Sequence, residues 1–157
     1  MDKVKIGGIL KNAHLARISV MGVPDRPGTA AAIFRVFGQT GINVPFIVQS
    51  VDQNNYDHII LCVDRDDLEV SLRLACEVQK ELCATTVTFD PQVASVSIFG
   101  PDFRERAGIA GTMFAALADV GINIQSISTS ISTISVIIAA DQLEAAVAAV
   151  ERVFELP

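Results

Sequence analysis

The stretch GVPDRPGTAAAIFRVFGQTGIN, residues 22–43, joins a strand-like pattern to a helical one. Ahead of it, ARISVMGV at 16–23 alternates apolar and polar residues, as a strand with one buried face does. Apolar residues then recur three or four apart until Gly41, which predicts a helix with Pro27 at its first position. The glycine-bracketed turn at 25–28 therefore precedes a helix start whose first backbone N–H groups have no partner within the helix.

The residues after this helix complete a β-α-β-β-α-β unit. Two strands are expected, 42–51 and 57–63, separated by the turn-forming DQNNYD. A second helix follows the acidic DRDD at 64–67 and reaches residue 82, and a last strand is expected at 85–90. This order predicts a ferredoxin-like α+β fold, in which two helices cover one face of an antiparallel four-stranded sheet.

The chain repeats this unit. AAIFRVFGQTGIN at 31–43 has a counterpart in GTMFAALADVGIN at 111–123, but the second copy stops at residue 157 without a fourth strand. We expect KVKIGGIL, residues 3–10, to supply it, so that the first module is inserted in the second. The second copy is expected to have strands at 93–99, 122–129 and 133–139 and helices at 107–120 and 141–154. The expected domains are 16–91 and, together, 1–15 and 92–157.

Composition narrows the class of protein. Half of the 157 residues are hydrophobic and the mean hydropathy is +0.44, which favours a partner subunit over apolar surface. A net charge of −6 with no basic run argues against nucleic acid and acidic membranes as partners, and no apolar run suits a bilayer span or signal peptide. A cytoplasmic location is expected. Cys62, Cys76 and Cys83 are odd in number and unpaired in spacing, which predicts reduced, mostly buried thiols.

No catalytic residue, cofactor or metal is expected. Gly7 and Gly8 fit neither a P-loop nor a dinucleotide fingerprint, and His14 and His58 lack partners at metal-ligand spacing. The DRDD run lacks the glycine and closing glutamate of a calcium loop, and is interpreted as helix-start charge. A nucleic-acid-binding β-α-β-β-α-β protein would need basic charge and strand aromatics, whereas this chain has no Trp and one Tyr.

The turn at 25–28 has groups suited to a free amino acid, which is a zwitterion. The helix start offers donors to a carboxylate, Asp25 can accept from an ammonium group, and Gly28 lets a ligand approach the backbone. Asn43 and Val44 would add main-chain groups at a strand edge. Each residue also has a purely structural explanation, since Asp25 can cap the helix, Gly28 can relieve the turn, and Asn43 can be a turn residue.

These motifs resemble those of a known family. GVPDRPG between first strand and first helix, with GIN opening the second strand, is similar to an ACT domain. Two such modules, a leading KIGGILKNAHLARISVMGVPDRPG, IVQSV at 47–51 and INIQSISTS at 122–130 resemble the regulatory region of aspartate kinases over almost the whole chain. The kinase domain is absent, so the nearest analogue is a separate regulatory beta subunit or an excised regulatory fragment.

The resemblance implies a non-catalytic chain that binds an end-product amino acid at a dimer interface, for feedback inhibition of the aspartate-family pathway that makes threonine and lysine. Threonine is the expected effector and lysine the second choice. The implied partners are a second copy of the chain, paired through its ACT modules, and an aspartate kinase catalytic subunit or domain. The alternative is a stand-alone ACT-domain sensor that controls another enzyme.

The resemblance also implies the ligand-binding residues. In the first module they are Asp25, Arg26, Pro27, Gly28, Thr29, Ala30, Asn43, Val44, Pro45 and Gln49. The second module of the other subunit would contribute Ile109, Ala110, Asn123, Ile124 and Ser130. Ile131 and Thr133 stand where the family commonly has a glutamate and a base, which argues against a second, lysine-type site. PDFRERAGIA replaces the Asp-x-Pro-Gly turn, so the second loop is not expected to hold its own ligand.

Overall fold

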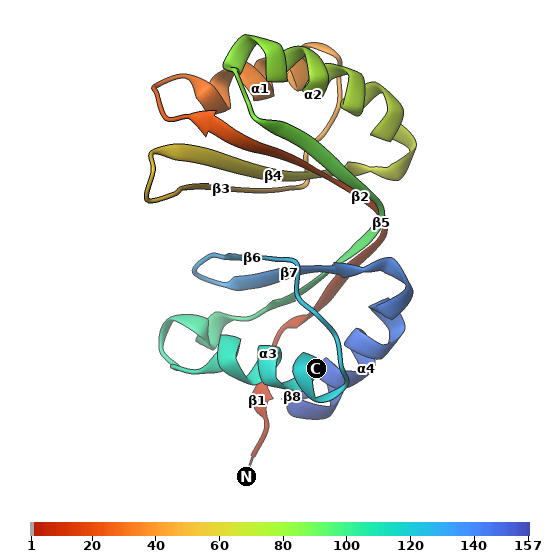
Figure 1. The fold of residues 1–157 in the computed structure, drawn as a ribbon. Helices are drawn as coiled ribbons and strands as arrows, with labels where there is room; N and C mark the ends of the chain where they lie inside the picture. Colours follow the sequence, from red (N-terminus) through yellow and green to blue (C-terminus); the bar gives the residue numbers. More distant parts are fainter. Residues whose placement is uncertain (1) are drawn as a thin grey trace. The chain divides into compact units, whose positions relative to one another are not determined.

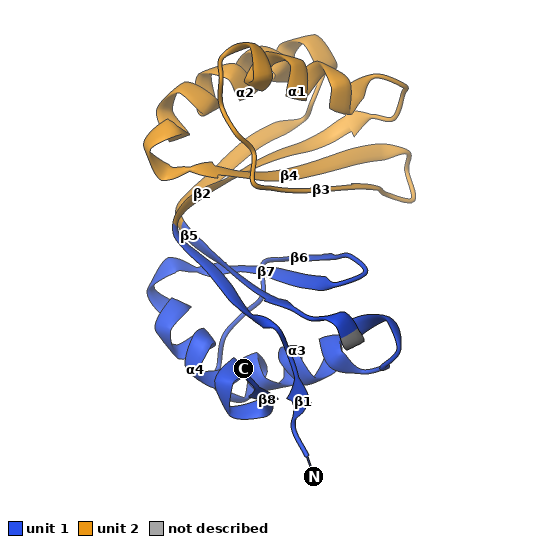
Figure 2. Ribbon diagram, turned by 180° about the vertical axis from the view of Figure 1, so that it is seen from behind, with its two compact units in different colours: residues 1–13, 93–157 blue, residues 14–92 orange. Residues whose placement is uncertain are grey.

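The structure, a computed structural model, describes residues 2–157, the side chain of Asp102 excepted. The chain divides into two compact units (Figure 2). Unit 1 contains the N-terminal segment up to Ala13 together with Val93–Pro157, and unit 2 is His14–Gln92. Each unit has the predicted ferredoxin-like arrangement, with two helices over one face of a four-stranded sheet (Figure 1). The α+β fold class predicted from the sequence is therefore confirmed.

In unit 2 the sheet order is β3-β4-β2-β5, and β4 is antiparallel to both β3 and β2. The elements are β2 (Gly8–Pro24, from His14 onward in this unit), α1 (Thr29–Gln39), β3 (Phe46–Val51), β4 (Tyr56–Asp64), α2 (Leu68–Leu82) and β5 (Thr86–Phe99, up to Gln92 in this unit). A short 3-10 turn, Arg65–Asp67, leads into α2.

The core of unit 2 lies between this sheet and its two helices. Alternation places every second residue of β2 and β4 on the helix side, where Ile18, Ile59 and Leu61 have no exposed surface. Burying one such side chain contributes about 1.5–3 kcal/mol to folding. From the helices, Ile33 and Phe37 of α1 complete the same cluster.

The first helix starts later than the sequence pattern predicts. Gly28 is the N-cap with φ 96°, a left-handed conformation, and α1 begins at Thr29. The prediction that Pro27 occupies the first helical position is therefore wrong, because the left-handed residue that follows the proline interrupts the helical path. No side chain caps α1, so the interpretation of Asp25 as a helix cap is also excluded.

In unit 1 the sheet order is β2-β5-β7-β6, and β7 is antiparallel to both β5 and β6. Its elements are β1 (Val4–Lys5), β2 up to Ala13, β5 from Val93, a 3-10 turn (Pro101–Arg104), α3 (Ile109–Asp119), β6 (Ser126–Thr129), β7 (Thr133–Ala139), a 3-10 turn (Ala140–Gln142), α4 (Leu143–Val153) and β8 (Phe154–Glu155). The short strands β1 and β8 form a parallel pair, with Val4 opposite Phe154.

The N-terminal segment packs into the core of unit 1. Ile6 is 4% exposed and belongs to the same cluster as Ile98 of β5, Met113 of α3 and Val150 of α4. Its neighbour Gly7 donates its backbone N–H to the carbonyl oxygen of Phe99. The prediction that residues 3–10 form one strand that completes this sheet is only partly correct. The strand is supplied by β2 from Gly8 to Ala13, whereas Val4 and Lys5 pair with β8 outside that sheet.

The second strand of each module starts later than expected. The backbone N–H of Ile42 bonds to the carbonyl oxygen of Phe37 at 3.0 Å, and that of Ile122 bonds to Leu117 at 3.0 Å. These bonds belong to the C-terminal turns of α1 and α3, so the residues after each glycine still close the helix. The strands therefore begin at Phe46 and Ser126.

The thiols differ from the sequence prediction. Only Cys62 is buried, whereas Cys76 and Cys83 are exposed, so the expectation of mostly buried thiols is wrong. Cys76 lies on an outward position of α2, and Cys83 directly follows that helix at its C-cap.

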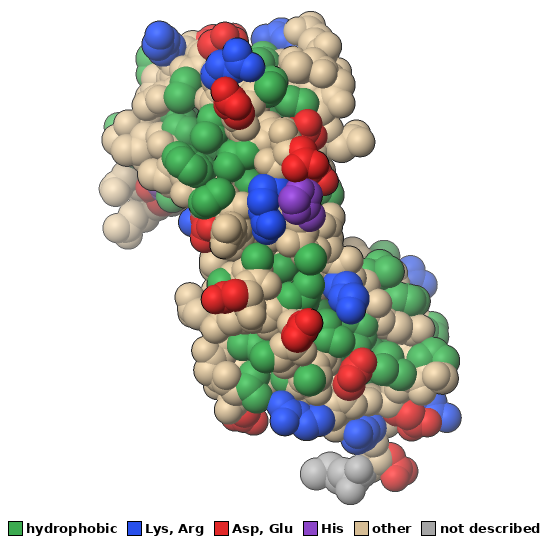
Figure 3. All heavy atoms as spheres, turned by 90° about the vertical axis from the view of Figure 1, so that its right-hand side faces the viewer, with side chains coloured by type: hydrophobic (Ala, Val, Ile, Leu, Met, Phe, Trp, Pro, Cys, Tyr) green, Lys and Arg blue, Asp and Glu red, His purple; other side chains and the backbone are tan. Residues whose placement is uncertain are grey.

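The surface mixes apolar and charged groups. On the face drawn in Figure 3, hydrophobic side chains lie in groups between single basic residues and scattered acidic ones. Among residues 2–157, no helix has both the length and the apolar character required to cross a membrane.

Candidate functional site

Gln49, a predicted ligand-binding residue of unit 2, contacts the buried carboxyl group of Asp57. Asp57 lies in β4, opposite Val23 of β2 and Val51 of β3, and is 1% exposed. Gln49 donates an Nε2–H to Oδ2 of Asp57 at 3.4 Å. Among the described residues, Oδ1 of Asp57 has no hydrogen-bond partner.

The surroundings of Asp57 disfavour its ionised form. Burial raises the pKa of its carboxyl, and the nearby carboxyl of Asp25 raises it further through a hydrogen bond and through charge. The charge of His58 lowers the same pKa and that of Asp52 raises it, both less strongly. Two adjacent carboxyl groups are stable together when they share a proton or face a positive charge.

The alternation of β4 explains why Asp57 is buried. Asp57, Ile59, Leu61 and Val63 are all buried and follow one another on the helix-facing side of the strand. Sequence reasoning assigned Asp57 to a turn and a strand start without a role. The sequence did contain a signal for its burial. Asp57 is the one carboxylate at the start of the otherwise apolar row of alternate residues in β4.

The turn between β2 and α1 is held in place by backbone bonds. Asp25 donates its backbone N–H to the carbonyl oxygen of Asn55 at 3.0 Å, which ties the turn to the β3–β4 hairpin. The hydroxyl of Thr29 donates to the carbonyl oxygen of Arg26 at 3.0 Å. The first turn of α1 has no acidic residue and no capping side chain, so its positive end is open to an anion.

The remaining residues predicted for the first module lie in two neighbouring segments of the chain. Arg26, Pro27 and Gly28 are exposed in the turn, whereas Thr29 is buried and Ala30 half-buried at the start of α1. In the loop between α1 and β3, Asn43 and Pro45 are exposed and Val44 is half-buried against the core.

In unit 1, three of the five predicted residues line one hollow of about 250 Å³: Ile109, Ala110 and Ser130. Arg106 also lines it. Thus the loop that is not expected to hold its own ligand does border a hollow. The other two predicted residues, exposed Asn123 and half-buried Ile124, lie in the loop between α3 and β6 and are not part of that lining.

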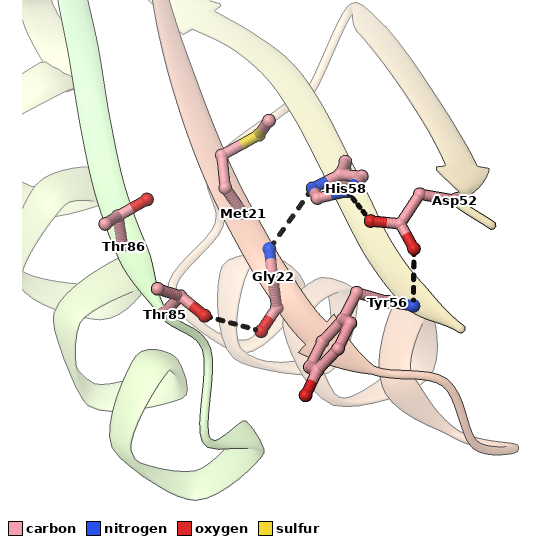
Figure 4. Close-up of a pocket in the computed structure, with 7 residues that line it drawn as sticks. All are labelled: Met21, Gly22, Asp52, Tyr56, His58, Thr85 and Thr86. Carbon is pink, nitrogen blue, oxygen red and sulfur yellow. Dashed lines mark hydrogen bonds and ion pairs between the residues drawn. The ribbon is translucent and has the colours of Figure 1, made fainter. Parts of the chain in front are cut away.

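Unit 2 also has a hollow, of about 260 Å³, which is built around a histidine–carboxylate pair (Figure 4). Nε2 of His58 lies 2.8 Å from Oδ2 of Asp52, and Gly22 donates its backbone N–H to Nδ1 of His58 at 3.2 Å. The hydrogen bond from His58 is the main reason that the pKa of Asp52 is lowered, followed by the bond from the Tyr56 backbone. The lining residues are Met21, Gly22, Asp52, Tyr56, His58, Thr85 and Thr86.

The fold also brings two carboxylates to His14, which sequence spacing had left without partners. Nε2 of His14 lies 2.9 Å from Oδ1 of Asp66 and 3.9 Å from Oδ1 of Asp64, and these exposed groups could surround a metal ion. However, the Arg65 guanidinium lies 3.5 Å from Nδ1 of His14 and offers it a donor. The proton therefore belongs on Nε2, facing the carboxylates, and the group is arranged as a surface hydrogen-bond cluster.

Comparison with known proteins agrees with this architecture. Two family models, both described as the ACT domain, match residues 16–78 and 96–154. Aspartate kinase of Pseudomonas fluorescens (strain SBW25) is 40% identical over 156 residues, which is 99% of this chain. The chain spans 38% of the length of that relative.

Solved structures of aspartate kinase regulatory subunits match this chain over nearly its whole length. The regulatory subunit of aspartate kinase from Thermus thermophilus, in ligand-free form, is 34% identical with a TM-score of 0.86, and the match covers 96% of this chain and 99% of that one. A structure of aspartokinase alpha and beta subunits matches with 34% identity and a TM-score of 0.86, over 94% and 97% of the two chains. E. coli aspartokinase III, in complex with lysine and aspartate, shares 18% identity and a TM-score of 0.71 over 98% of this chain and 34% of that one, a likeness of fold alone.

The chain therefore belongs to the ACT-domain family. Its two ACT domains in tandem place it with the regulatory subunits of aspartate kinases, as the sequence resemblance predicts. It corresponds to the regulatory region, and residues 2–157 contain no kinase domain.

Proposed function

We propose that this chain is a cytoplasmic, non-catalytic regulator that binds an end-product amino acid and transmits feedback inhibition to an aspartate kinase. Threonine is the first-choice effector and lysine the second. The observation that carries the proposal is the uncapped start of α1, which follows directly after the turn that contains Asp25. Gln49, a second predicted binding residue, is hydrogen-bonded to the buried Asp57 of β4. The presence of lysine in the complex of E. coli aspartokinase III supports an amino acid as the ligand class.

The groups around the turn suit the two charges of a free amino acid. The ammonium group would lie against the Asp25 carboxylate, and the carboxylate would face the uncapped start of α1. Gly28 is exposed and carries no side chain, and a Cβ at this position would meet no atom within 4 Å. A ligand can therefore approach the backbone of the turn closely.

The proposed site lies at an interface with a second copy of the chain. Strand β3 is an edge of the sheet in unit 2, and its Ile47 and Val51 are 37% and 51% exposed. An edge strand with exposed apolar side chains favours coverage by another chain. In the dimer, Ile109, Ala110 and Ser130 with Asn123 and Ile124 would come from the second module of the other subunit. Sedimentation that finds only monomer, with and without threonine, would contradict this assembly.

The kinase itself would be a separate catalytic subunit or domain. The chain spans 38% of its Pseudomonas relative, and the match to a regulatory subunit at full length supports an arrangement of this kind. The alternative predicted from the sequence, a stand-alone sensor for another enzyme, differs from an aspartate kinase regulator in one measurable respect. Added to an aspartate kinase catalytic subunit, a regulator makes its activity sensitive to threonine, whereas a sensor for another enzyme leaves the activity unchanged.

Asp25→Asn tests the effector site directly, because the amide keeps the size of the side chain and removes its charge. A charge-assisted hydrogen bond is worth about 1.5–3 kcal/mol, so threonine affinity measured by calorimetry should fall about tenfold to a hundredfold. Thr133→Lys is the control outside the proposed site and should leave threonine binding nearly unchanged. If the parent binds neither threonine nor lysine at millimolar concentration, the proposal fails.

A further inference from the structure

The hollow in unit 2 gives solvent access to a histidine whose two ring nitrogens are both engaged. The side chain of His58 is 26% exposed and lines the hollow (Figure 4). Its Nδ1 accepts the backbone N–H of Gly22 at 3.2 Å, and its Nε2 lies 2.8 Å from Oδ2 of Asp52. The neutral ring has one nitrogen that accepts and one that donates, and each of them has its partner here.

Both partners of His58 belong to segments that hold the proposed effector turn. Gly22 lies at the bulge of β2, on the strand that leads into Asp25. Asp52 organises the β3–β4 hairpin, because its Oδ1 accepts two backbone N–H groups of that hairpin. In the same hairpin, the carbonyl oxygen of Asn55 accepts the backbone N–H of Asp25 at 3.0 Å. The ring of His58 therefore joins the two segments from which the turn extends.

A second proton on His58 can only go to Nδ1. Nε2 already carries the hydrogen that faces Asp52, so Nδ1 is the unprotonated position of the ring. When a proton from solvent binds there, Nδ1 becomes a donor that faces another donor, the N–H of Gly22, and their hydrogen bond is lost. The bond to Asp52 remains and becomes an ion pair, because the lowered pKa of Asp52 keeps its carboxylate ionised. Protonation therefore releases the bulge and leaves the ring attached to the hairpin.

Among the residues that line the hollow, His58 is the one that can gain a positive charge. The titratable groups around it are the carboxylate of Asp52, the phenol of Tyr56 and, next in sequence, the buried carboxyl of Asp57, which the charge of Asp25 also affects. The lining residues from β2 and from positions 85–86 have no titratable side chain, and the residue opposite His58 in β3 is a serine. Imidazole is the group whose charge changes between about pH 5 and 8.

We propose that His58 is a pH-responsive positioning residue for the effector turn, which keeps its binding arrangement while the ring is neutral. The inference rests on the proposed effector site. With the neutral ring, the bulge and the hairpin are both fixed, and threonine meets a preorganised turn. Protonation frees the bulge ahead of Asp25, so the ligand must order that segment and loses affinity. Threonine affinity therefore falls as the pH falls through the range of imidazole protonation, and binding in that range releases a proton.

Two substitutions separate the two hydrogen bonds of His58. His58→Asn keeps an acceptor, Oδ1, close to the position of Nδ1, and the amide does not titrate. His58→Gln instead keeps an N–H donor close to the position of Nε2 and leaves Gly22 without its acceptor. The pair therefore distinguishes the bond to the bulge from the bond to the hairpin.

The test is titration calorimetry of the whole chain with threonine at several values between about pH 8 and 5. The affinity of the parent should fall about threefold to tenfold over this range, which is the effect of losing one hydrogen bond. His58→Asn should bind as the parent does at the upper end and lose the fall in affinity. His58→Gln should bind about threefold to tenfold more weakly at the upper end and change little below it. The carboxyl of Asp57 is present in all three proteins, so differences between their profiles belong to His58.

His14→Asn is the matched control, because His14 is the other histidine of the chain and does not line the hollow. This variant should keep the pH profile of the parent. Nitrogen NMR of the parent adds a test that needs neither a variant nor a ligand. As the pH falls, the amide of Gly22 should shift together with the protonation of Nδ1 in His58. A Gly22 amide that does not respond to this protonation would overturn the inference.

The outcomes separate the two proposals. If the parent binds threonine with the same pH profile as His58→Asn, the effector site stands and His58 has no role in it. If the parent binds neither threonine nor lysine at millimolar concentration, both proposals fail together.

Discussion

Gly22 donates its backbone N–H to Nδ1 of His58, and this bond determines which ring nitrogen carries the proton. Nδ1 must be the acceptor, so Nε2 bears the hydrogen that faces Asp52 at 2.8 Å. The bulge between Met21 and Val23 in β2 places Gly22 for this bond. A backbone irregularity in one strand thereby fixes the tautomer of a side chain in its neighbour.

The first prediction concerns acid stability at Asp52. The pKa of Asp52 is lowered below 3.8, chiefly by His58, so the ionised carboxylate stabilises the folded state above pH 3.8. That contribution is lost as the pH falls through the lowered pKa. Asp52→Asn should therefore be less stable than the parent at pH 7, and the difference should shrink at pH 3. Urea unfolding followed by circular dichroism at both values checks this, and a constant difference would contradict it.

The second prediction concerns the bulge itself. Gly22 has φ +69°, and a Cβ built on it would lie 2.8 Å from the Cβ of Thr85. Gly22→Ala should therefore lower the free energy of unfolding by about 1–3 kcal/mol. Gly38→Ala is the matched control, because its Cβ would meet nothing and alanine suits the interior of α1. Equal stabilities of the two variants in thermal unfolding would exclude a conformational role for Gly22.

The third prediction concerns the N-terminal segment. Ile6→Ala removes a buried side chain from the core of unit 1 and should cost about 2–5 kcal/mol. Leu10→Ala, at a position 58% exposed, should change stability little. Hydrogen exchange should show the loss of protection by Ile6→Ala in residues 93–157 rather than in 16–92. Loss confined to 16–92 would show that Ile6 supports the other unit.

The fourth prediction concerns thiol reactivity. Burial raises the pKa of Cys62 to about 12, so this thiol is protonated and inaccessible in the folded protein. Cys76 and Cys83 are exposed. Alkylation with iodoacetamide at pH 8, located by mass spectrometry, should modify Cys76 and Cys83 in the native protein and Cys62 only after unfolding. Rapid native labelling of Cys62 would contradict its burial.

The order of strands and helices could be predicted because it depends on local patterns. Alternation marked the strands, apolar spacing marked the helices, and the repeat showed that both modules share one fold. The errors occurred where a backbone conformation decides the boundary. Gly28 in the left-handed region moves the start of α1 beyond Pro27, and the C-terminal turn of α1 includes Ile42, which the pattern assigns to a strand.

The composition of the candidate site was harder to predict. The turn residues could be proposed because their types match an amino-acid ligand and a family motif. Asp57 could not, because its burial and its bond to Gln49 depend on the pairing of β3 with β4 rather than on a local motif. The pairing of Val4 with Phe154 was equally hidden, since strands of two residues have no periodicity to detect.

The parallel pair β1–β8 has a consequence for synthesis on the ribosome. Val4 and Lys5 are translated 150 residues ahead of their partners Phe154 and Glu155. At about 5–20 residues per second, the N-terminal strand waits roughly 8–30 s for them, whereas residues 14–92 form a contiguous unit that can fold meanwhile. During this interval the apolar side chain of Ile6 is without its core. Nascent chains stalled before Phe154 should therefore be the ones that engage chaperones.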